Sequence, residues 1–349
     1  MSIPGTITPV FTPLFETADQ STATAYPDGF DAGMAALLGQ ACQLTYAQYG
    51  TAGAPISLSE LTLVPGVSCY RQLGAALEWT EAIGLGAVQP GSAGMATVPF
   101  GFAFTAQDAG GNAVFHVIAF RGTRSYSEWV SDASAIPAIF GLGSGAGFVH
   151  GGFYEVYNAG GSTPPAAGTL AAQVRTILGL IEGSSVPLYI AGHSLGAALA
   201  ELCAADVGYN FKSGYFSALY EYSLASPQVA AGIATSFVTV GPSYFQDEFG
   251  QAVTGGAYRI VNAADLVPIV PFSITSASGY GIEFAATIPA ANTLSYLVQT
   301  GDVGNNHACD LYAGFLDQLP ETWSAAAEAV APAKIAVPAI GPTDAAVPA

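Results

Sequence analysis

The sequence predicts an α/β fold in which helices flank a largely parallel central sheet. Strand-like and helix-like segments alternate between residues 113 and 262, which is the pattern of a parallel sheet with crossover helices. A serine bracketed by glycines, in the segment 192–196, stands between an apolar strand-like run and a helix-like run. The chain has 349 residues, enough to bury a large core, and no linker divides it. We therefore expect a single domain over residues 28–324.

The composition excludes several classes of partner. Hydrophobic residues make up 51% of the chain and charged residues 9%, yet no apolar run reaches the roughly 18 residues of a membrane-spanning helix. The formal net charge of −18 arises from 7 Lys and Arg against 25 Asp and Glu. Such a surface repels nucleic acid and anionic membranes. The sequence therefore predicts a soluble globular protein with no nucleic-acid partner and no integral membrane segment.

The four cysteines favour neither a zinc site nor a disulfide scaffold, because they lie far apart and form no Cys-x-x-Cys. Cys203, in the helix after the serine motif, is expected to be a buried apolar residue. One disulfide among Cys42, Cys69 and Cys309 stays open. No basic segment followed by an apolar one begins the chain, so no signal peptide is visible. We expect no metal and no cofactor.

The first third of the chain combines an extended start with one helix and one hairpin. Residues 1–27, rich in Pro and Thr, are expected to form an extended leader, and residues 28–49 a helix with one apolar side. A short strand or turn is expected at 61–64 and a helix near 72–82. The strands 98–105 and 113–120 are joined by Asp-Ala-Gly-Gly-Asn, which favours a hairpin.

The middle of the chain carries the alternating pattern. Residues 133–149 have no charge and much glycine, which predicts a mobile apolar loop. A helix is expected from Pro165, since proline suits a first turn, to about Glu182. The strand 186–191 and the helix 197–207 then enclose the serine motif, and a strand follows at 220–225.

The last third returns to strands and ends in a helix. A strand is expected at 257–262, followed by hairpin strands at 280–288 and 294–299. A final helix reaches about Leu319. Residues 325–349, rich in Ala and Pro, are expected to be a disordered or loosely docked tail.

The segment Gly192-His193-Ser194-Leu195-Gly196 carries the chemistry. A Gly-x-Ser-x-Gly at a strand-to-helix turn is the nucleophile elbow of α/β-hydrolases, in which small flanking residues let the serine hydroxyl stand clear of the sheet edge. The pattern is common by chance in a chain with 42 glycines, but its place between a strand and a helix makes it specific. Ser194 is therefore the predicted nucleophile.

A serine nucleophile needs a base, and imidazole is the usual one. His307 follows the last strands, where the chain order Ser, Asp, His places the base. His116 lies within a strand and is expected to be structural, and His193 points away from the serine hydroxyl as a support residue. His150, after the glycine-rich segment, stays an alternative base.

The imidazole needs a carboxylate that fixes its tautomer, and the oxyanion needs two donors. Asp265 directly follows a strand between Ser194 and His307, whereas Asp206 lies on the elbow helix and Asp247 follows no strand. The amide of Leu195 is one predicted oxyanion donor. Thr123, after the strand 113–120, is the other, through its amide and its hydroxyl.

Taken together, these segments resemble the fungal-type triacylglycerol lipases, the class 3 lipase family. The resemblance covers roughly residues 30–320 and depends on five segments in the family's order, completed by His307 and Tyr312: Ala119-Phe120-Arg121-Gly122-Thr123; Glu128-Trp129-Val130-Ser131-Asp132; Val149-His150-Gly151-Gly152-Phe153; Ala191 to Ala198; and Arg259-Ile260-Val261-Asn262 through Asp265-Leu266-Val267-Pro268.

The resemblance implies a short lid at residues 125–132, with Tyr126, Trp129 and Val130 as its apolar face, and Thr123 as the family's oxyanion Ser/Thr. It implies a secreted protein, with a cytoplasmic one as the alternative, that meets acylglycerols at a lipid–water interface. The oligomeric state stays open, with a monomer expected. The family commonly has Gly-Ser-Pro-Arg-Val-Gly where this chain has Ala225-Ser226-Pro227-Gln228-Val229-Ala230, a difference that concerns chain-length preference more than the triad.

The sequence thus predicts a serine carboxylester hydrolase that cleaves acylglycerols, a triacylglycerol lipase. A feruloyl-type or short-chain esterase and a phospholipase A1 remain alternatives, because one scaffold hosts all of them. Arg124, directly before the lid segment, is the one basic candidate there for a phospholipid head group. A catalytically silent lipid-binding protein is disfavoured by the intact Ser, Asp, His order.

Overall fold

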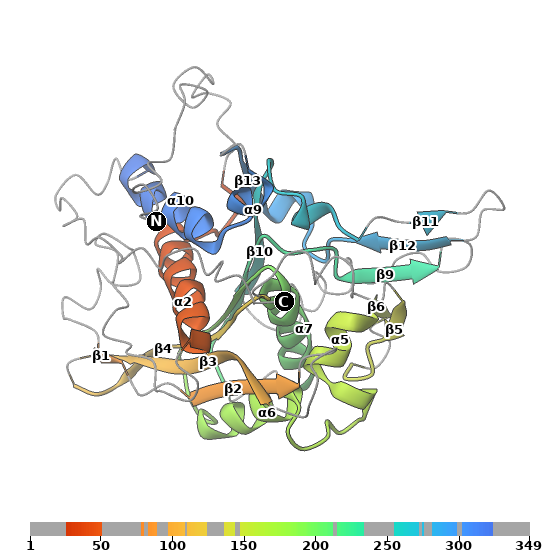
Figure 1. Ribbon diagram of the computed structural model, residues 1–349. Coiled ribbons are helices and arrows are strands. Elements are labelled where there is room, and N and C mark those ends of the chain that lie inside the picture. The colour runs from red at the N-terminus through yellow and green to blue at the C-terminus, as the bar shows by residue number, and fades with distance from the viewer. Residues whose placement is uncertain are drawn as a thin grey trace.

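A computed structural model describes residues 26–50, 78–79, 83–88, 97–108, 110–123, 136–143, 147–211, 215–233, 255–271, 274–275, 281–298 and 302–323. Its main sheet has eight strands in the order β1-β3-β4-β7-β8-β10-β13, with β2 paired to β3 (Figure 1). Their bounds are β1 Glu78–Trp79, β2 Ile83–Val88, β3 Thr97–Gln107, β4 Ala113–Phe120, β7 Leu188–His193, β8 Leu219–Leu224, β10 Gly255–Asn262 and β13 Thr293–Tyr296.

The sheet is parallel from β4 to β13 and antiparallel from β1 to β4. The buried strands β4 and β7 are almost wholly apolar, as expected when both faces of a sheet are covered. Parallel strands place their carboxyl ends on one edge, and a strand-to-helix turn there supports chemistry. This topology confirms the predicted α/β-hydrolase fold.

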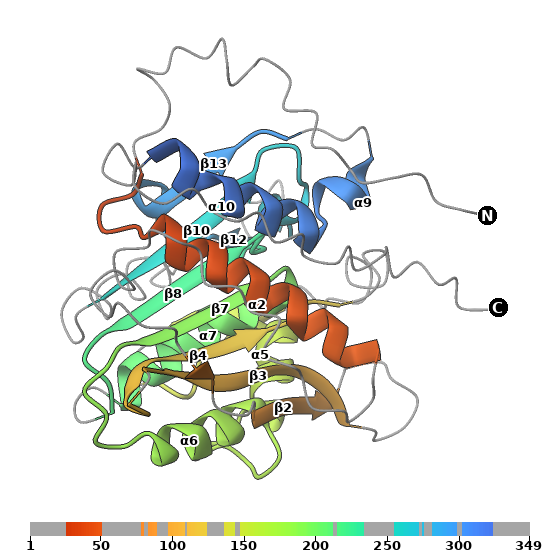
Figure 2. The same ribbon diagram turned by 90° about the vertical axis from the view of Figure 1, so that its left-hand side faces the viewer.

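Helices cover both faces of the main sheet (Figure 2). The helices α2 (Ala32–Gly50) and α10 (Cys309–Trp323) lie side by side on one face, and their apolar side chains share a core cluster with Tyr222 and Ile260. The helices α5 (Gly151–Tyr157), α6 (Leu170–Leu180) and α7 (Leu195–Asn210) cover the other face around a second cluster. The sheet is therefore the middle layer of three.

A second sheet of five short strands lies beside the main one, in the order β11-β12-β9-β6-β5, and projects to the right in Figure 1. The sequence did not predict it as a unit. Its strands come from segments far apart along the chain, so local sequence patterns do not reveal their pairing. Their bounds are β5 Pro137–Ile139, β6 Phe148–His150, β9 Ala230–Ile233, β11 Ile274–Thr275 and β12 Gly281–Ala285.

The structure corrects two predictions that concern the strands of this second sheet. The segment 133–149 is not a mobile loop throughout, because β5 and β6 pair within it and Phe140 and Leu142 are buried. The strands near 280–288 and 294–299 do not form a hairpin. Pro289 and the 3-10 turn Ala290–Asn292 redirect the chain, so that β12 pairs with β9 whereas β13 pairs in parallel with β10.

The helix predicted near 72–82 and the start of the helix predicted at Pro165 also need correction. Glu78–Trp79 forms β1, because the long strand β3 offers it Gln107 and Ala106 as partners. The strand β2, which was not predicted, follows. Helix α6 begins only at Leu170, where the Thr169 hydroxyl accepts a hydrogen bond from the Ala172 amide at 3.2 Å and caps the first turn.

The other predicted elements are confirmed within a few residues. Asp31 caps α2 by accepting the amides of Gly33 and Met34, each at 3.0 Å, and Asp108 organises the hairpin turn by accepting the amides of Gly110 and Asn112. The final helix is preceded by the short α9 (Val303–Asn306), with His307 between them.

Several predictions lie outside the described residues. They are the leader up to residue 25, the strand or turn at 61–64, the lid with Tyr126, Trp129 and Val130, and the tail. Cys69 and Asp247 also lie outside them, whereas Cys42, Cys203 and Cys309 are buried free thiols. Among the described helices, none is long and apolar enough to cross a membrane.

Candidate active site

The nucleophile elbow joins β7 to α7 through Ser194, whose backbone has φ 60° and ψ −127°. A non-glycine residue pays a steric cost there, and such strain persists only where surrounding structure enforces it. The enforcement is visible: the Ser194 amide donates to the carbonyl of Leu224 at 2.9 Å, which ties the turn to the end of β8. The strained turn lifts the serine side chain above the sheet edge.

The two glycines of the motif are required by close approach. A Cβ added at Gly192 would lie 2.0 Å from the carbonyl oxygen of Gly196, and one added at Gly196 would lie 2.5 Å from the carbonyl oxygen of Phe120. Both neighbours are backbone atoms and cannot rotate away. The elbow therefore packs directly on the end of β4, the strand that leads to Thr123.

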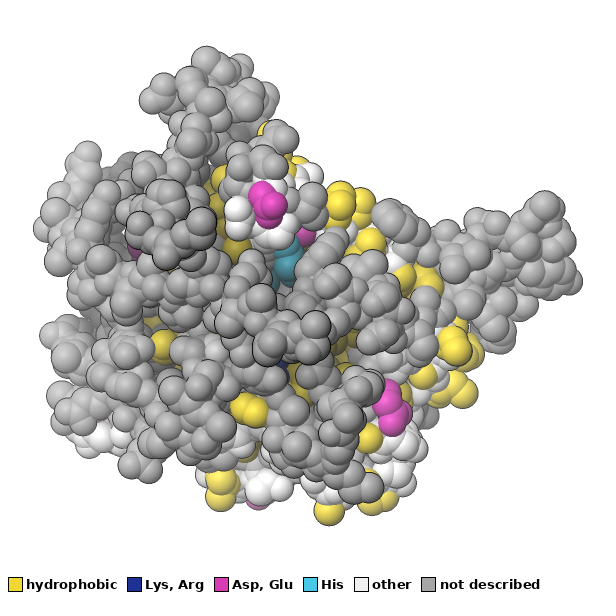
Figure 3. All heavy atoms as spheres, in the orientation of Figure 1, with side chains coloured by type: hydrophobic (Ala, Val, Ile, Leu, Met, Phe, Trp, Pro, Cys, Tyr) yellow, Lys and Arg dark blue, Asp and Glu magenta, His cyan; other side chains and the backbone are white. Residues whose placement is uncertain are grey.

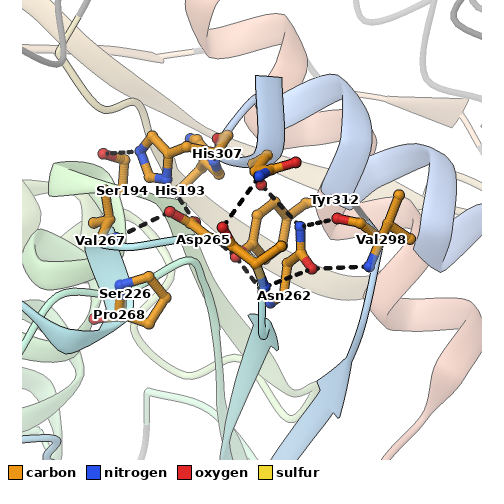
Figure 4. A network of polar contacts seen from close by, with 12 residues as sticks. His193, Ser194, Ser226, Asn262, Asp265, Val267, Pro268, Val298, His307 and Tyr312 are labelled. Carbon is orange, nitrogen blue, oxygen red and sulfur yellow. Dashed lines mark hydrogen bonds and ion pairs between the residues drawn. The ribbon is translucent and has the colours of Figure 1, made fainter. Parts of the chain in front are cut away.

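The structure brings Ser194, His307 and Asp265 together from three separate segments (Figure 4). The Ser194 Oγ lies 2.8 Å from His307 Nε2, and His307 Nδ1 lies 2.7 Å from Asp265 Oδ2. All three residues are at least nine-tenths buried. The arrangement is that of a nucleophile, a base and a carboxylate that orients the base.

Asp265 is held on both oxygens. Its Oδ1 accepts the amide of Val267 at 2.9 Å, and its Oδ2 accepts the Tyr312 hydroxyl at 2.8 Å in addition to His307 (Figure 4). Burial, followed by the neighbouring Tyr296 and Asp265, raises the pKa of Tyr312 well above its ordinary value, so the phenol keeps its proton and stays a donor. The carboxylate is thereby fixed in the orientation that faces the imidazole.

Asn262, at the end of β10, fastens the loops around this carboxylate. Its side chain donates to the carbonyls of Val298 and Asn306 at 2.9 and 3.0 Å and accepts the amides of Val298 and Ala264. Asn306 precedes His307, so one buried amide links the Asp265 segment to the histidine segment. The sequence analysis placed Asn262 only at the end of a strand. A polar asparagine at the end of an otherwise apolar strand was the signal that could have indicated this role.

His193 supports the site from beneath, as predicted. Its Nε2 lies 2.9 Å from the carbonyl oxygen of His307, which can only accept, so Nε2 carries the proton. Its Nδ1 then accepts the Tyr46 hydroxyl at 2.8 Å, and that hydroxyl accepts the Gly122 amide at 3.0 Å. Burial, followed by the nearby His307, lowers the pKa of His193 well below its ordinary value, so the ring is neutral.

This chain of contacts also bears on the predicted oxyanion donors. The Gly122 amide already donates to the Tyr46 hydroxyl, so it is not free to bind an oxyanion. The next amide along the chain is that of Thr123, a partly exposed residue. A Cβ at Gly122 would lie 2.8 Å from the Ser194 Cβ, so the segment passes directly beside the nucleophile. Leu195 is the first residue of α7, and a helix leaves its first amides without an acceptor of its own. The role of Thr123 and Leu195 stays a prediction.

The other histidines and Asp206 lie elsewhere. His116 contacts the hydroxyls of Thr105 and Ser184 at 2.7 and 2.8 Å, and burial lowers its pKa. His150, the alternative base, is fully buried and stacks on Phe153 with ring centroids 4.0 Å apart, and both of its ring nitrogens are without a hydrogen-bond partner among the described residues.

Asp206 faces away from the site, as predicted from its place on the elbow helix. Its carboxylate pairs with Arg175 at 2.6 Å and accepts from Tyr157 and Asn210. Within the described part of the chain, no three His, Cys, Asp or Glu side chains cluster in a way that could hold a metal ion.

In Figure 3 a histidine side chain reaches the surface near the middle of the face, with an acidic side chain above it and hydrophobic side chains to its right. Leu266 and Ile269, just after Asp265, are 45% and 46% exposed, large values for apolar side chains so close to the triad.

Comparison with known proteins places this geometry in context. Residues 117–275 match the family model described as Lipase (class 3). Phospholipase A1-II 3 of Oryza sativa subsp. indica is 31% identical over 168 residues, which are 44% of this chain and 38% of that protein. Phospholipase A1-IIgamma of Arabidopsis thaliana is 30% identical over 169 residues, again 44% of this chain and 38% of that protein. The chain thus spans well under half the length of these curated relatives.

A solved structure of the triacylglyceride lipase of Rhizomucor miehei is 19% identical, with 80% of this chain and 91% of that chain covered and a TM-score of 0.45. The assignment of the fold depends on the sheet topology and the elbow described above.

Proposed function

Since residues 117–275 belong to the class 3 lipase family, we propose that this chain is a serine carboxylester hydrolase that cleaves acylglycerols. The observation that carries the proposal is the continuous contact from Asp265 through His307 to the Ser194 hydroxyl, at 2.7 and 2.8 Å, on a strained elbow. A structural serine needs neither the strain nor an oriented imidazole.

The reaction follows from these contacts. His307 Nε2 accepts the Ser194 proton while Oγ bonds to the carbonyl carbon of the ester, and the carbonyl π electrons move to oxygen. The amides of Leu195 and Thr123 stabilise that oxyanion. The intermediate collapses, the glycerol oxygen leaves with the proton from His307, and the acyl group remains on Ser194. Water, deprotonated by His307, then bonds to the acyl carbon, and the fatty acid leaves as Ser194 Oγ takes the proton from His307. Asp265 stabilises the imidazolium in both halves.

Apolar surface beside the site supports an acylglycerol rather than a small polar ester. Leu266 and Ile269 project to solvent directly after the catalytic carboxylate, where an acyl chain or an oil surface would cover them. We place the lid of this enzyme at Tyr126, Trp129 and Val130, by resemblance alone. A secreted monomer acting at a lipid–water interface belongs to the same proposal.

Phospholipase A1 is the second candidate, favoured by the names of the plant relatives. A phospholipid head group carries a phosphate that a cation usually binds. Among the described residues, Arg121 and Arg259 are largely buried and Arg175 is paired with Asp206, so Arg124, which lies outside the described residues, stays the candidate cation for a phospholipid head group.

The test compares hydrolysis of tributyrin, triolein and phosphatidylcholine, each taken through its solubility limit, by the wild type and Ser194→Ala. We expect a rate jump when the triolein emulsion forms, no activity in the variant, and fluorophosphonate labelling of the wild type alone. Faster release from phosphatidylcholine than from triolein would replace the lipase by the phospholipase. Saturation on soluble esters with both lipids inert would leave an esterase, and labelling of the Ser194→Ala variant would overturn the assignment of the nucleophile.

A further inference from the structure

A second polar network lies beneath the catalytic turn, between α7 and the main sheet. It contains two fully buried acids, Glu201 on α7 and Glu221 on β8, with the Ser223 hydroxyl between them. The Ser223 Oγ lies 2.9 Å from Glu201 Oε1 and also contacts Glu221 Oε1. The other oxygen of Glu201 accepts the Thr287 hydroxyl. The proposed reaction uses none of these groups.

The donors and acceptors of this network determine which of the two acids carries a proton. A serine hydroxyl has one proton and can donate to only one carboxylate. Its contact with the second acid therefore needs a proton on that acid. Glu201 has donors on both oxygens, whereas Oε2 of Glu221 has no hydrogen-bond partner among the residues that the structure describes. Such a vacancy is tolerable for a neutral carbonyl oxygen and costly for a carboxylate. The proton therefore belongs on Glu221 Oε1, donating to Ser223, and Glu201 is the anion.

Arg259 provides the counter-charge and reaches the catalytic loops. It lies on β10, paired with Ser223 of β8, and its charge acts on both acids. Its Nη2 donates to the carbonyl of Ser226 at 2.7 Å and to that of Pro268 at 2.6 Å. One guanidinium nitrogen thus ties together the two loops that flank the triad.

Each of those loops carries part of the site. The Ser226 loop continues β8, whose last residue, Leu224, accepts the Ser194 amide, and Pro268 follows Val267, whose amide holds Asp265. Figure 4 shows Ser226 and Pro268 next to each other below Val267. A shift of Arg259 would therefore move the nucleophile and the carboxylate relative to each other.

We propose that Arg259 is a positioning residue for the triad, and that its buried charge is offset by an acid pair in which Glu201 is ionised and Glu221 keeps its proton. The inference deepens the proposed function, since it names the groups that set the geometry of the proposed active site. The trio is then neutral overall, which is the arrangement that burial favours.

The pKa directions agree with the hydrogen bonds. Burial, then the charge of Glu201, raises the pKa of Glu221 well above its ordinary value, against the opposing effects of Ser223 and Arg259. Burial also raises the pKa of Glu201, but hydrogen bonds from Ser226, Thr287 and Ser223 and the charge of Arg259 oppose it. The other titratable groups coupled to Glu221 are the thiols of Cys42 on α2 and Cys203 on α7.

The matched pair Glu221→Gln and Glu201→Gln tests the proton assignment. A glutamine at 221 keeps a donor toward Ser223 and the same net charge, so kcat should stay within about twofold of the wild type at neutral pH. A glutamine at 201 removes the largest opposing charge that acts on Arg259 and leaves Asp265 as a weaker one, so kcat should fall by about tenfold or more with KM little changed. The reverse order, or equal losses, would overturn the assignment.

Two measurements do not depend on activity. The infrared band of a protonated carboxylic acid should be present in the wild type at neutral pH, lost in Glu221→Gln, and unchanged in Glu155→Gln, which removes an exposed acid. The folded protein keeps a proton that the unfolded chain releases above the ordinary Glu pKa, so stability declines as pH rises through that window. The melting temperature of Glu221→Gln should lack this decline, and a band that persists would refute the proposal.

Arg259 is tested by Arg259→Lys, which keeps the charge but ends one bond short of the Nη2 position, so its ammonium does not reach both carbonyls as Nη2 does. We expect a loss of kcat without a matching rise in KM, provided that circular dichroism shows a folded protein. An unchanged kcat would overturn the positioning role. If the wild type hydrolyses no ester, the proposed function fails, while the infrared band and the melting profile still decide the acid pair.

Discussion

Two glycines of α7 should respond to the same substitution in opposite ways. A Cβ added at Gly196, in the first turn, would lie 2.5 Å from the carbonyl oxygen of Phe120 and 2.6 Å from the carbonyl carbon of Arg121. Both belong to the backbone at the end of β4, so no flexible side chain can yield. At Gly208, in the last turn of the same helix, the nearest atom is Leu219 Cδ2 at 3.8 Å, which is ordinary contact.

The magnitudes follow from these distances. To restore 3.4 Å at Gly196, the elbow must move away from β4 by roughly 0.9 Å, and overpacking of this kind costs about 1–3 kcal/mol of stability. A displacement of about 1 Å at reacting groups lowers rates by about 100-fold. Gly208→Ala meets no obstacle and gains about 0.5–1 kcal/mol from helix propensity and a less flexible unfolded chain.

The assay measures melting temperature and kcat/KM on tributyrin for both variants. Gly196→Ala should lower the melting temperature and reduce kcat/KM by about 100-fold, while Gly208→Ala should raise the melting temperature and leave kcat/KM unchanged. A Gly196→Ala variant with wild-type kcat/KM would refute the argument that the elbow is positioned by contact with β4. A destabilised Gly208→Ala would refute the packing described around the end of α7.

Three further substitutions test separate contacts. Tyr312→Phe removes the 2.8 Å hydrogen bond to Asp265, and because such a bond to a charged group is worth about 1.5–3 kcal/mol, kcat should fall by about tenfold or more with KM unchanged; wild-type kinetics would contradict this. Burial lowers the pKa of His150 to about 4. Between pH 6.5, the approximate ordinary pKa of histidine, and pH 4, His150 is protonated in the unfolded chain and neutral in the folded protein. The free energy of unfolding should therefore fall by about 3 kcal/mol as the pH is lowered through this range. His150→Phe should lose this acid sensitivity in melting curves and keep full activity, and loss of activity would revive His150 as the base. Asp31→Ala removes the cap of α2 and should cost about 1 kcal/mol in denaturant unfolding, whereas Asp31→Asn should cost much less; equal losses would show that the cap is not the cause.

The sequence predicted the triad because each member occupies a locally recognisable position. Ser194 lies in a short motif, Asp265 follows a strand directly, and His307 lies beyond the last strands. Since parallel strands end on one edge, these positions converge without any knowledge of side-chain packing. The catalytic roles of the three residues stay predictions until the variants are measured.

What the sequence did not predict depends on contacts between distant segments. The second sheet pairs residues near 138, 149, 231, 275 and 283, and no local pattern encodes such pairings. Glu201 and Glu221 stand in a helix-like and a strand-like run, where an acid is ordinarily exposed to solvent. Only the packing of α7 on β8 shows that both are buried together.

At Ala225 the departure from the family's sequence pattern coincides with an unusual backbone conformation. The family commonly has glycine at this position, and the structure gives Ala225 a φ of 54°, a conformation that favours glycine. The departure noted in the sequence therefore marks a strained residue directly after β8, close to Ser194, and not only a change in the rim of the acyl pocket.

Strain at Ser194 and at Ala225 has a common support in the sheet. Each of the two residues lies at the end of a parallel strand, and a sparsely populated backbone conformation of this kind costs roughly 1–3 kcal/mol. The Ser194 amide donates to Leu224, and the Ala225 amide donates to Ile260 at 3.0 Å, so each strained turn is tied to the next strand. Arg259, one residue before Ile260, then fixes the loop that follows Ala225. The strained conformation of Ser194 is thus maintained by successive hydrogen bonds that connect the ends of β7, β8 and β10. A substitution that weakens any of these hydrogen bonds should reduce kcat more than it changes substrate binding.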